Sequence, residues 1–253
     1  MSPVNPGSAL GQAIGNLFEG KLEEILRKVV EDSGYVYHSG LDPLPGYTGT
    51  TLRVKDKNGK FWRIDSAVTD KNGHLIILGE MKYIQRAKHA TDKGSWICNC
   101  HPLLRQTYPT IRASIAMLAG GWTENVRGMI RDVGTDIFFV PYEKVVNTFS
   151  QKRIEINWTD ATSDVASQIA WEAFGHLDEQ ALDEIKDCMT REIAEPLKMH
   201  VENILNDKKE RKITKIEINI QTNKGETINV QHSNAEEAQA ALKNLQSHPF
   251  FQN

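Results

Sequence analysis

The chain has 253 residues, of which 40% are hydrophobic and 25% charged, and its net charge is −3 at pH 7. This composition excludes disordered and fibrous proteins, and no apolar run is long enough to cross a bilayer. Three cysteines, Cys98, Cys100 and Cys188, are too few for a disulfide framework, and no apolar leader opens the chain. We therefore expect a soluble cytoplasmic protein with reduced thiols and no membrane partner.

The first predicted element is an amphipathic helix over residues 9–32. Its apolar residues recur with the helical period and form one stripe: Leu10, Ile14, Leu17, Phe18, Leu22, Ile25, Leu26 and Val29. Ser33-Gly34 is a typical helix end. Residues 35–49 then predict a short strand and a loop rich in glycine and proline.

Three strand-like runs come next, at residues 51–56, 60–68 and 74–83. Asn58-Gly59 and Asn72-Gly73 separate them, and Asn-Gly between apolar runs is the strongest short signal for a hairpin. These runs therefore predict an antiparallel meander of three strands.

The middle of the chain is predicted to alternate helices and strands. We expect an irregular linker over residues 84–100, a helix over residues 101–120 interrupted by its internal proline, and a helix over residues 122–132. Further strands are expected over residues 136–142 and 153–158. Because a strand reached through a helix usually joins its sheet in parallel, the predicted fold is α/β, with a central mixed sheet flanked by helices.

The C-terminal third predicts two helices over residues 161–205 and then a hairpin and a helix over residues 211–245. We expect three domains: a core at residues 1–158, a helical segment at residues 159–206 and a small ββα appendage at residues 207–253.

Charge is unevenly distributed along the chain. Between Asp160 and Asn206, eleven acidic residues stand against three basic ones, a balance of −8, so the remainder of the chain carries +5. The positive charge on the remainder of the chain is compatible with a polyanionic partner, although such a distribution of surface charge can also occur without any function. The apolar stripe over residues 182–204 is a candidate seam between two copies of the chain.

The strand at residues 74–83 begins apolar and ends with two opposite charges, Glu80 and Lys82. Side chains two apart on a strand point to one face, and the hairpin brings Asp65 opposite Glu80, within about 5.5 Å between Cα atoms. Carboxylates that close repel unless a cation lies between them, and their oxygens suit Mg²⁺ or Mn²⁺. Lys82 beside such an ion could orient a water or stabilise charge on phosphorus, which is the chemistry of phosphodiester hydrolysis.

Asp65 followed by Glu80-Met81-Lys82, within an order of helix, three strands, helix and strand, resembles the PD-(D/E)xK nuclease superfamily. The resemblance covers residues 10–158 and implies the restriction-endonuclease-like core of that superfamily. Two departures are visible. Ile64 stands where the name-giving proline would be, and no Gln-x-x-x-Tyr motif of the exonuclease branch is present, which favours an endonuclease.

The resemblance implies roles for individual residues. Asp65, Glu80 and the carbonyl of Met81 would bind Mg²⁺, for which Mn²⁺ would substitute, and Lys82 would assist the attacking water. The acidic residue that the superfamily often carries on its first helix maps onto Glu19, within "GNLFEGKLEEILRKVVEDSGY". The implied activity is site-specific cleavage of double-stranded DNA by a homodimer of the type II restriction kind.

Basic and amide side chains after the charged strand are candidates for DNA contacts, because Lys and Arg bind phosphates and Arg and Gln make bidentate base contacts. We single out five: Arg86, Lys88, Lys93, Arg105 and Gln106.

Other interpretations stay open. The nuclease could be a structure-specific repair enzyme or resolvase, or the chain could be a nucleic-acid-binding module without catalysis. Glu80 and Lys82 could form only an exposed ion pair, worth about 0–1 kcal/mol. Cys98, Cys100 and His101 look like a fragment of a zinc site, but no second Cys/His pair follows at the required spacing.

Overall fold

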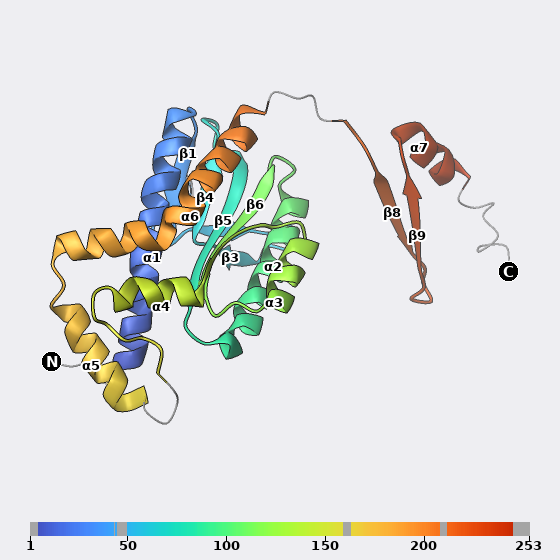
Figure 1. Cartoon of the computed structure of the whole chain (residues 1–253). Coiled ribbons are helices and arrows are strands. Elements are labelled where there is room, and N and C mark those ends of the chain that lie inside the picture. The colour runs from blue at the N-terminus through green and yellow to red at the C-terminus, as the bar shows by residue number, and fades with distance from the viewer. Residues whose placement is uncertain (1–4, 43, 45–49, 159–162, 208–211, 245–253) are drawn as a thin grey trace. The chain divides into compact units, whose positions relative to one another are not determined.

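A five-stranded mixed sheet forms the centre of the larger of two units, residues 1–206, in a computed structural model of the chain (Figure 1). The structure describes residues 5–42, 44, 50–158, 163–207 and 212–244. In spatial order, the strands are β1 (Val36–Ser39), β4 (Ser66–Thr69), β5 (Leu75–Ile84), β6 (Ala113–Gly120) and β7 (Asp136–Pro141). The pairs β1–β4 and β4–β5 are antiparallel, and β5–β6 and β6–β7 are parallel. The expected α/β class with a mixed sheet is thus confirmed.

The predicted three-strand meander is wrong in one respect, because its middle strand is broken. β2 (Arg53–Lys55) and β3 (Phe61–Arg63) pair only with each other, in a separate two-stranded sheet. Ile64 still donates its N–H to the carbonyl of Leu52, at 3.3 Å, and the chain then bends at Asp65 before β4 begins. The break places Asp65 at the start of a central strand.

The second error concerns residues 84–120. The predicted linker holds a 3-10 turn, η1 (Ala87–His89), and most of helix α2 (Ala90–Thr107), while residues 113–120 form strand β6 rather than a helix. All eight residues of β6 are buried. A strand covered on both faces is a continuous apolar run, which periodicity alone cannot distinguish from a buried helix.

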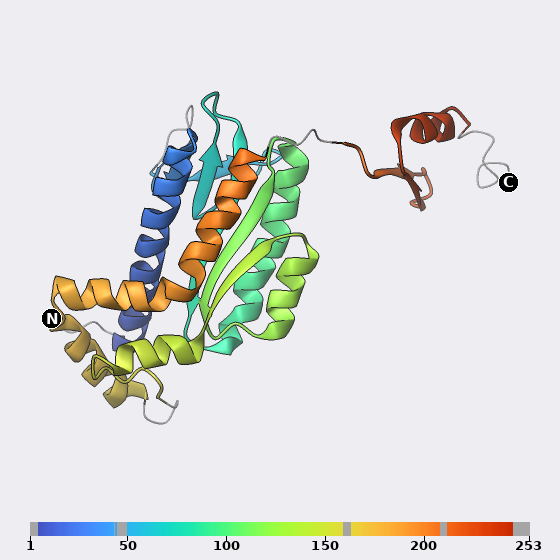
Figure 2. The ribbon, with the colours of Figure 1, turned by 45° about the horizontal axis from the view of Figure 1, so that its top comes forward.

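Helices cover both faces of the sheet (Figure 2). One face packs against α1 (Pro6–Asp32) and α6 (Glu179–Asn206), in a core that includes Phe18, Met81 and Met117. The other face packs against α2 and α3 (Glu124–Asp132). The predicted helix at 122–132 is therefore confirmed. Residues 154–158 form no strand, so β7 is the last strand of this sheet in the described part of the chain.

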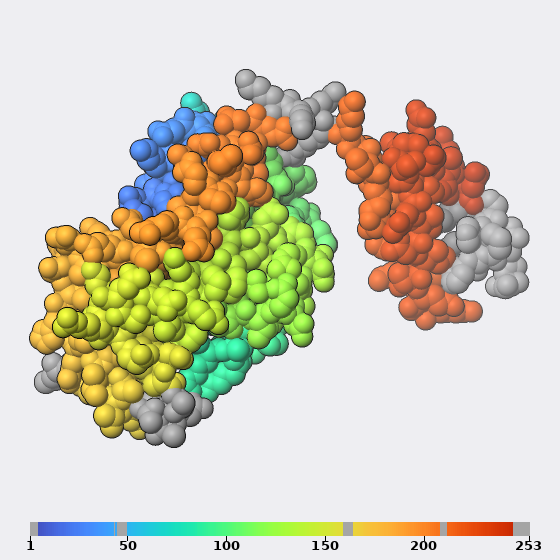
Figure 3. Space-filling view, in the orientation of Figure 1, coloured from blue at the N-terminus to red at the C-terminus, as the bar shows by residue number. Residues whose placement is uncertain are grey.

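The apolar stripe at 182–204 is not a seam between copies. Five of its residues are buried inside this chain: Ile185, Met189, Ile193, Leu197 and Val201. α6 contacts α1, and the space-filling view shows it lying across the surface of the larger unit (Figure 3). Helices α4 (Tyr142–Ser150) and α5 (Ser163–Gly175) belong to the same core, so the predicted helical segment is part of the larger unit. Pro196 lies within α6, which changes direction along its length (Figure 1).

The smaller unit, residues 207–253, is a hairpin followed by a helix. Its elements are β8 (Ile216–Gln221), β9 (Thr227–His232) and α7 (Ala235–Lys243). Gly225 adopts φ +82° in the turn of the hairpin, a conformation that glycine accepts without strain. None of the described helices is both long and apolar enough to cross a membrane.

Candidate active site

Asp65, Glu80 and Lys82 converge at one point on the α2 face of the sheet. Ser66 pairs with Gly79 in the ladder of β4 and β5, so the next step of the register sets Asp65 opposite Glu80. Glu80 and Lys82 are two residues apart on β5 and point to the same face. The bend before β4 and the period of β5 are therefore the two local features that assemble this acid–lysine cluster.

The contacts within the cluster are direct. The Lys82 ammonium donates to Oδ2 of Asp65 and lies 3.1 Å from Oε2 of Glu80. The backbone N–H of Met81 donates to the same Oδ2 of Asp65, at 2.9 Å. One cation thus lies between two carboxylates from neighbouring strands.

Burial makes this arrangement more than a surface ion pair. The Glu80 side chain is 1% exposed, and those of Asp65 and Lys82 are 22% and 24% exposed. Burial, reinforced by the charge of Glu80, raises the pKa of Asp65 to about 7. Burial opposes the charge on Lys82, but the two carboxylates outweigh it and raise the pKa of its ammonium. The interpretation of Glu80 and Lys82 as an exposed pair is therefore wrong.

His101, on α2, is a member of the site that the sequence reasoning did not assign. Its side chain is fully buried, and its Nε2 lies 3.7 Å from Oε1 of Glu80. Neither ring nitrogen has a hydrogen-bond partner among the described residues, and the same holds for both carboxylate oxygens of Glu80. Burial acts to raise the pKa of Glu80, but His101 and Lys82 outweigh it, so the pKa is lowered. The signal in the sequence was a histidine in register with Ile97 and Leu104 on a buried helix face.

Glu19 interacts electrostatically with the acid–lysine cluster. It lies on α1 and is half-buried, and burial raises the pKa of its carboxyl. The charge of Lys82 lowers that pKa and the charge of Glu80 raises it, so both groups act on Glu19. The structure therefore brings Glu19 near the cluster without an ion pair to Lys82 among the described contacts.

The five candidate DNA-contacting residues are spread over the molecule. Lys88 and Lys93 are exposed near the start of α2. Arg86 lines a polar hollow of about 280 Å³ with Gln85, Tyr142, Asn157 and Trp158. Gln106 is exposed at the other end of α2, where its side chain accepts from Lys57 at 3.4 Å. The helix separates Lys93 from Gln106 by about 20 Å, at 1.5 Å per residue.

Arg105 has a structural role in the fold. Its guanidinium donates to the carbonyls of Val133 and Gly134, just after α3 ends. These carbonyls are among the groups that a helix end leaves unpaired, and an arginine that binds them closes the turn between α3 and β7. The donors of Arg105 that these bonds use serve the chain itself, and its contact with DNA stays a prediction.

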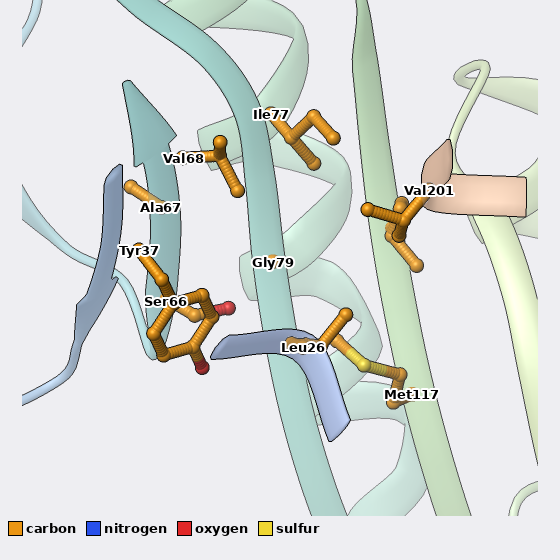
Figure 4. A pocket seen from close by; sticks show the side chains of 10 residues that line it. Leu26, Tyr37, Ser66, Ala67, Val68, Ile77, Gly79, Met117 and Val201 are labelled. Atoms are coloured by element: carbon orange, nitrogen blue, oxygen red, sulfur yellow. The ribbon is translucent and has the colours of Figure 1, made fainter. Parts of the chain in front are cut away.

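One void lies in the interior of the larger unit, among described residues. The void in Figure 4 has a volume of about 10 Å³ and lies among mostly apolar side chains, including Tyr37, Ile77 and Met117. This volume holds about one water molecule. It is too small for a substrate.

Groups of side chains that could hold a metal ion were sought among the described residues. Among the described residues, no three His, Cys, Asp or Glu side chains are grouped to hold a metal ion, so a zinc site at Cys98, Cys100 and His101 is not supported. No family model matches the chain, and neither a curated protein nor a solved structure matches it.

Proposed function

We propose that this chain is a Mg²⁺-dependent endonuclease that hydrolyses double-stranded DNA at specific sites. The observation that carries the proposal is the convergence of Asp65 and Glu80, from neighbouring strands, on the ammonium of Lys82. A protein gains little stability from burying two acids and a lysine, because desolvation offsets most of their attraction. Such a cluster at the edge of a core is better explained by chemistry than by folding.

The acid pair fits a hard divalent cation. Its carboxylates already share one positive charge. Among the described residues, Oε1 of Glu80 has no hydrogen-bond partner, and Oε2 has only the ion pair with Lys82. The N–H of Met81 faces Asp65, so the backbone at the third predicted ligand lies beside the first. Mg²⁺ usually keeps several waters and takes only one or two carboxylates, so a pair of acids without a third one grouped beside it among the described residues is compatible with this ion. When bound, the ion would polarise the phosphoryl oxygen and acidify a water.

The chain's own residues then have distinct roles. Because its pKa is raised, Lys82 stays protonated at neutral pH and acts as a fixed positive charge rather than as a base. Such a charge stabilises the negative charge that develops on phosphorus. Glu80 and Asp65 would hold the cation, and His101 lies 3.7 Å from Oε1 of Glu80, the oxygen that is not paired with Lys82.

The order of elements also supports the proposal. Helix α1 precedes the antiparallel strands β4 and β5, and α2 then leads to the parallel strand β6. The resemblance to the PD-(D/E)xK nucleases rests on an order of helix, three strands, helix and strand. The structure has this order with β1 as the first of the three strands and with β6 where a helix was predicted. Cleavage of both strands requires two active sites, so a second copy would have to join through a surface other than the stripe at 182–204.

A digest of plasmid and phage DNA tests the proposal. With Mg²⁺ we expect discrete fragments, and with a chelator we expect intact DNA. Cutting only of branched or damaged DNA would replace site-specific cleavage with a repair activity. Binding without cleavage in Mg²⁺ and in Mn²⁺ would contradict the nuclease proposal.

A further inference from the structure

The outer face of the β8–β9 hairpin is rich in amides and poor in charge. Side chains on the two strands alternate between half-buried and exposed positions. The half-buried ones, such as Ile218 and Val230, lie on the face that α7 covers with Ala238. The exposed ones form what we call the amide face: Glu217, Asn219, Gln221, Thr227, Asn229 and Gln231.

Exposure to water alone does not explain this composition. Asparagine is depleted in strands, where β-branched and aromatic residues are favoured. Yet Asn219 and Asn229 are directly opposed in the middle of the ladder, with Glu217 opposite Gln231 and Gln221 opposite Thr227 on either side. A two-stranded sheet has little stability to spare, so the paired asparagines point to a role outside the fold.

We propose that the amide face reads base edges in the major groove of the DNA substrate. The major groove admits a two-stranded ribbon, and Asn and Gln make bidentate hydrogen bonds to adenine. Side chains on one face of a strand recur every two residues, about 6.7 Å. That spacing is about twice the 3.4 Å between successive nucleotides of a strand, so successive rows of the amide face would meet every second base pair. The choice of DNA as the partner rests on the proposed function.

Charges at the borders of the amide face fit this partner. Lys212 is exposed before β8, and Lys224 is exposed in the turn. Their ammonium groups suit the phosphates on either side of a groove. Glu217, the acid on the face, is paired with Lys215 at 2.7 Å and accepts from Gln231 at 3.0 Å. Its negative charge is therefore partly compensated.

The test measures which duplexes the full chain selects. Wild-type protein is incubated in a chelator with a library of randomised duplexes, and the bound fraction is sequenced. We expect enrichment of a motif rich in A·T pairs. The double variant Asn219→Ala/Asn229→Ala should lose at least about tenfold in preference for that motif over random duplex. Asn219→Thr/Asn229→Thr should lose it too, and since threonine favours strands, unfolding would not explain that loss.

Two controls separate the contributions. Gln239→Ala removes an exposed amide from α7 and should leave the selection unchanged. Lys224→Ala should weaken binding to all duplexes equally. It should also reduce the steepness of the plot of log affinity against log salt concentration by about 0.9.

The proposal is overturned if both double variants select the same motif as the wild type, or if they change only the oligomeric state of the chain. Its failure can be told apart from that of the nuclease. If the variants of Asn219 and Asn229 cleave the same sites as the wild type in Mg²⁺, only the proposal for the amide face is contradicted. If the wild type selects a motif that depends on these residues but cleaves no DNA, only the nuclease proposal is contradicted.

Discussion

The two faces of strand β5 differ in the chemistry that they bury. Toward α1 and α6, Met81 is 1% exposed and packs in a cluster of hydrophobic side chains. Toward α2, its neighbour Glu80 is 0% exposed and meets Lys82 and His101. The same depth of burial thus serves packing on one face and a charged cluster on the other, which teaches that burial alone does not identify a core position.

The largest effect on activity is expected from substitutions in the acid–lysine cluster. Glu80→Gln and Lys82→Met should each lower the rate of DNA cleavage at least about a hundredfold, because each removes a charge that acts on the transition state. Steady-state cleavage of plasmid measures the rate. Lys28→Met, which removes an exposed charge from α1, is the matched control and should cleave normally. Near-normal rates in both site variants would remove these residues from the active site.

A smaller effect should separate His101 from ordinary packing. His101→Leu should lower the free energy of unfolding by about 1–3 kcal/mol, because the buried carboxylate of Glu80 loses a polar neighbour. In a Glu80→Gln background, His101→Leu should lower the free energy of unfolding by less, because residue 80 then carries no charge. Urea unfolding of the four proteins at pH 7 in chelator gives the cycle. Equal costs in both backgrounds would show that His101 acts only by filling space.

Close packing on the α2 face predicts a comparable loss. A Cβ at Gly94 would lie 2.3 Å from Cγ1 of Val126 on α3. Gly94→Ala should therefore destabilise the protein by about 1–3 kcal/mol, since a valine side chain is stiff.

Two comparisons check this packing by thermal unfolding. Combining Gly94→Ala with Val126→Ala should remove the clash. Gly11→Ala on α1, where nothing lies within 4 Å of the added methyl, should instead stabilise the helix by up to about 1 kcal/mol. A stabilised Gly94→Ala would mean that α2 and α3 are farther apart than the structure places them.

The smallest effect concerns His38, a polar group at the edge of the sheet whose pKa is lowered. Burial is the main cause, Arg27 adds to it and Asp42 opposes it. His38 also hydrogen-bonds Thr69, at 2.9 Å. Because the folded pKa lies below that of the unfolded chain, near 6.5, this contribution to stability is complete above that pH and is lost as the pH falls through the folded value.

His38→Gln keeps a polar group and removes the titration. The wild type should therefore lose stability relative to His38→Gln as the pH falls from 7 to 5, whereas the difference should be constant from pH 7 to 8. Urea unfolding across this range measures both slopes. Parallel curves over the whole range would contradict the lowered pKa.

Sequence reasoning succeeded where the signal was local. The period of two along β5 and the hairpin before it brought Asp65, Glu80 and Lys82 together without any tertiary information. It failed where structure depends on distant contacts. The apolar run of β6 has no period that distinguishes strand from helix, and the role of Arg105 depends on the end of a helix 28 residues away. His101 was missed because its partner lies on another element.

The position of the Lys82 ammonium has a consequence for how this protein matures. A pair of acids with no cation between them would repel and oppose the closing of β4 onto β5, and the chain would depend on an outside ion to fold. Here the counter-ion is the ammonium of Lys82, which is part of strand β5 and lies beside both acids. The charges of this acid pair are therefore balanced within the chain itself, and folding needs no divalent ion for that purpose.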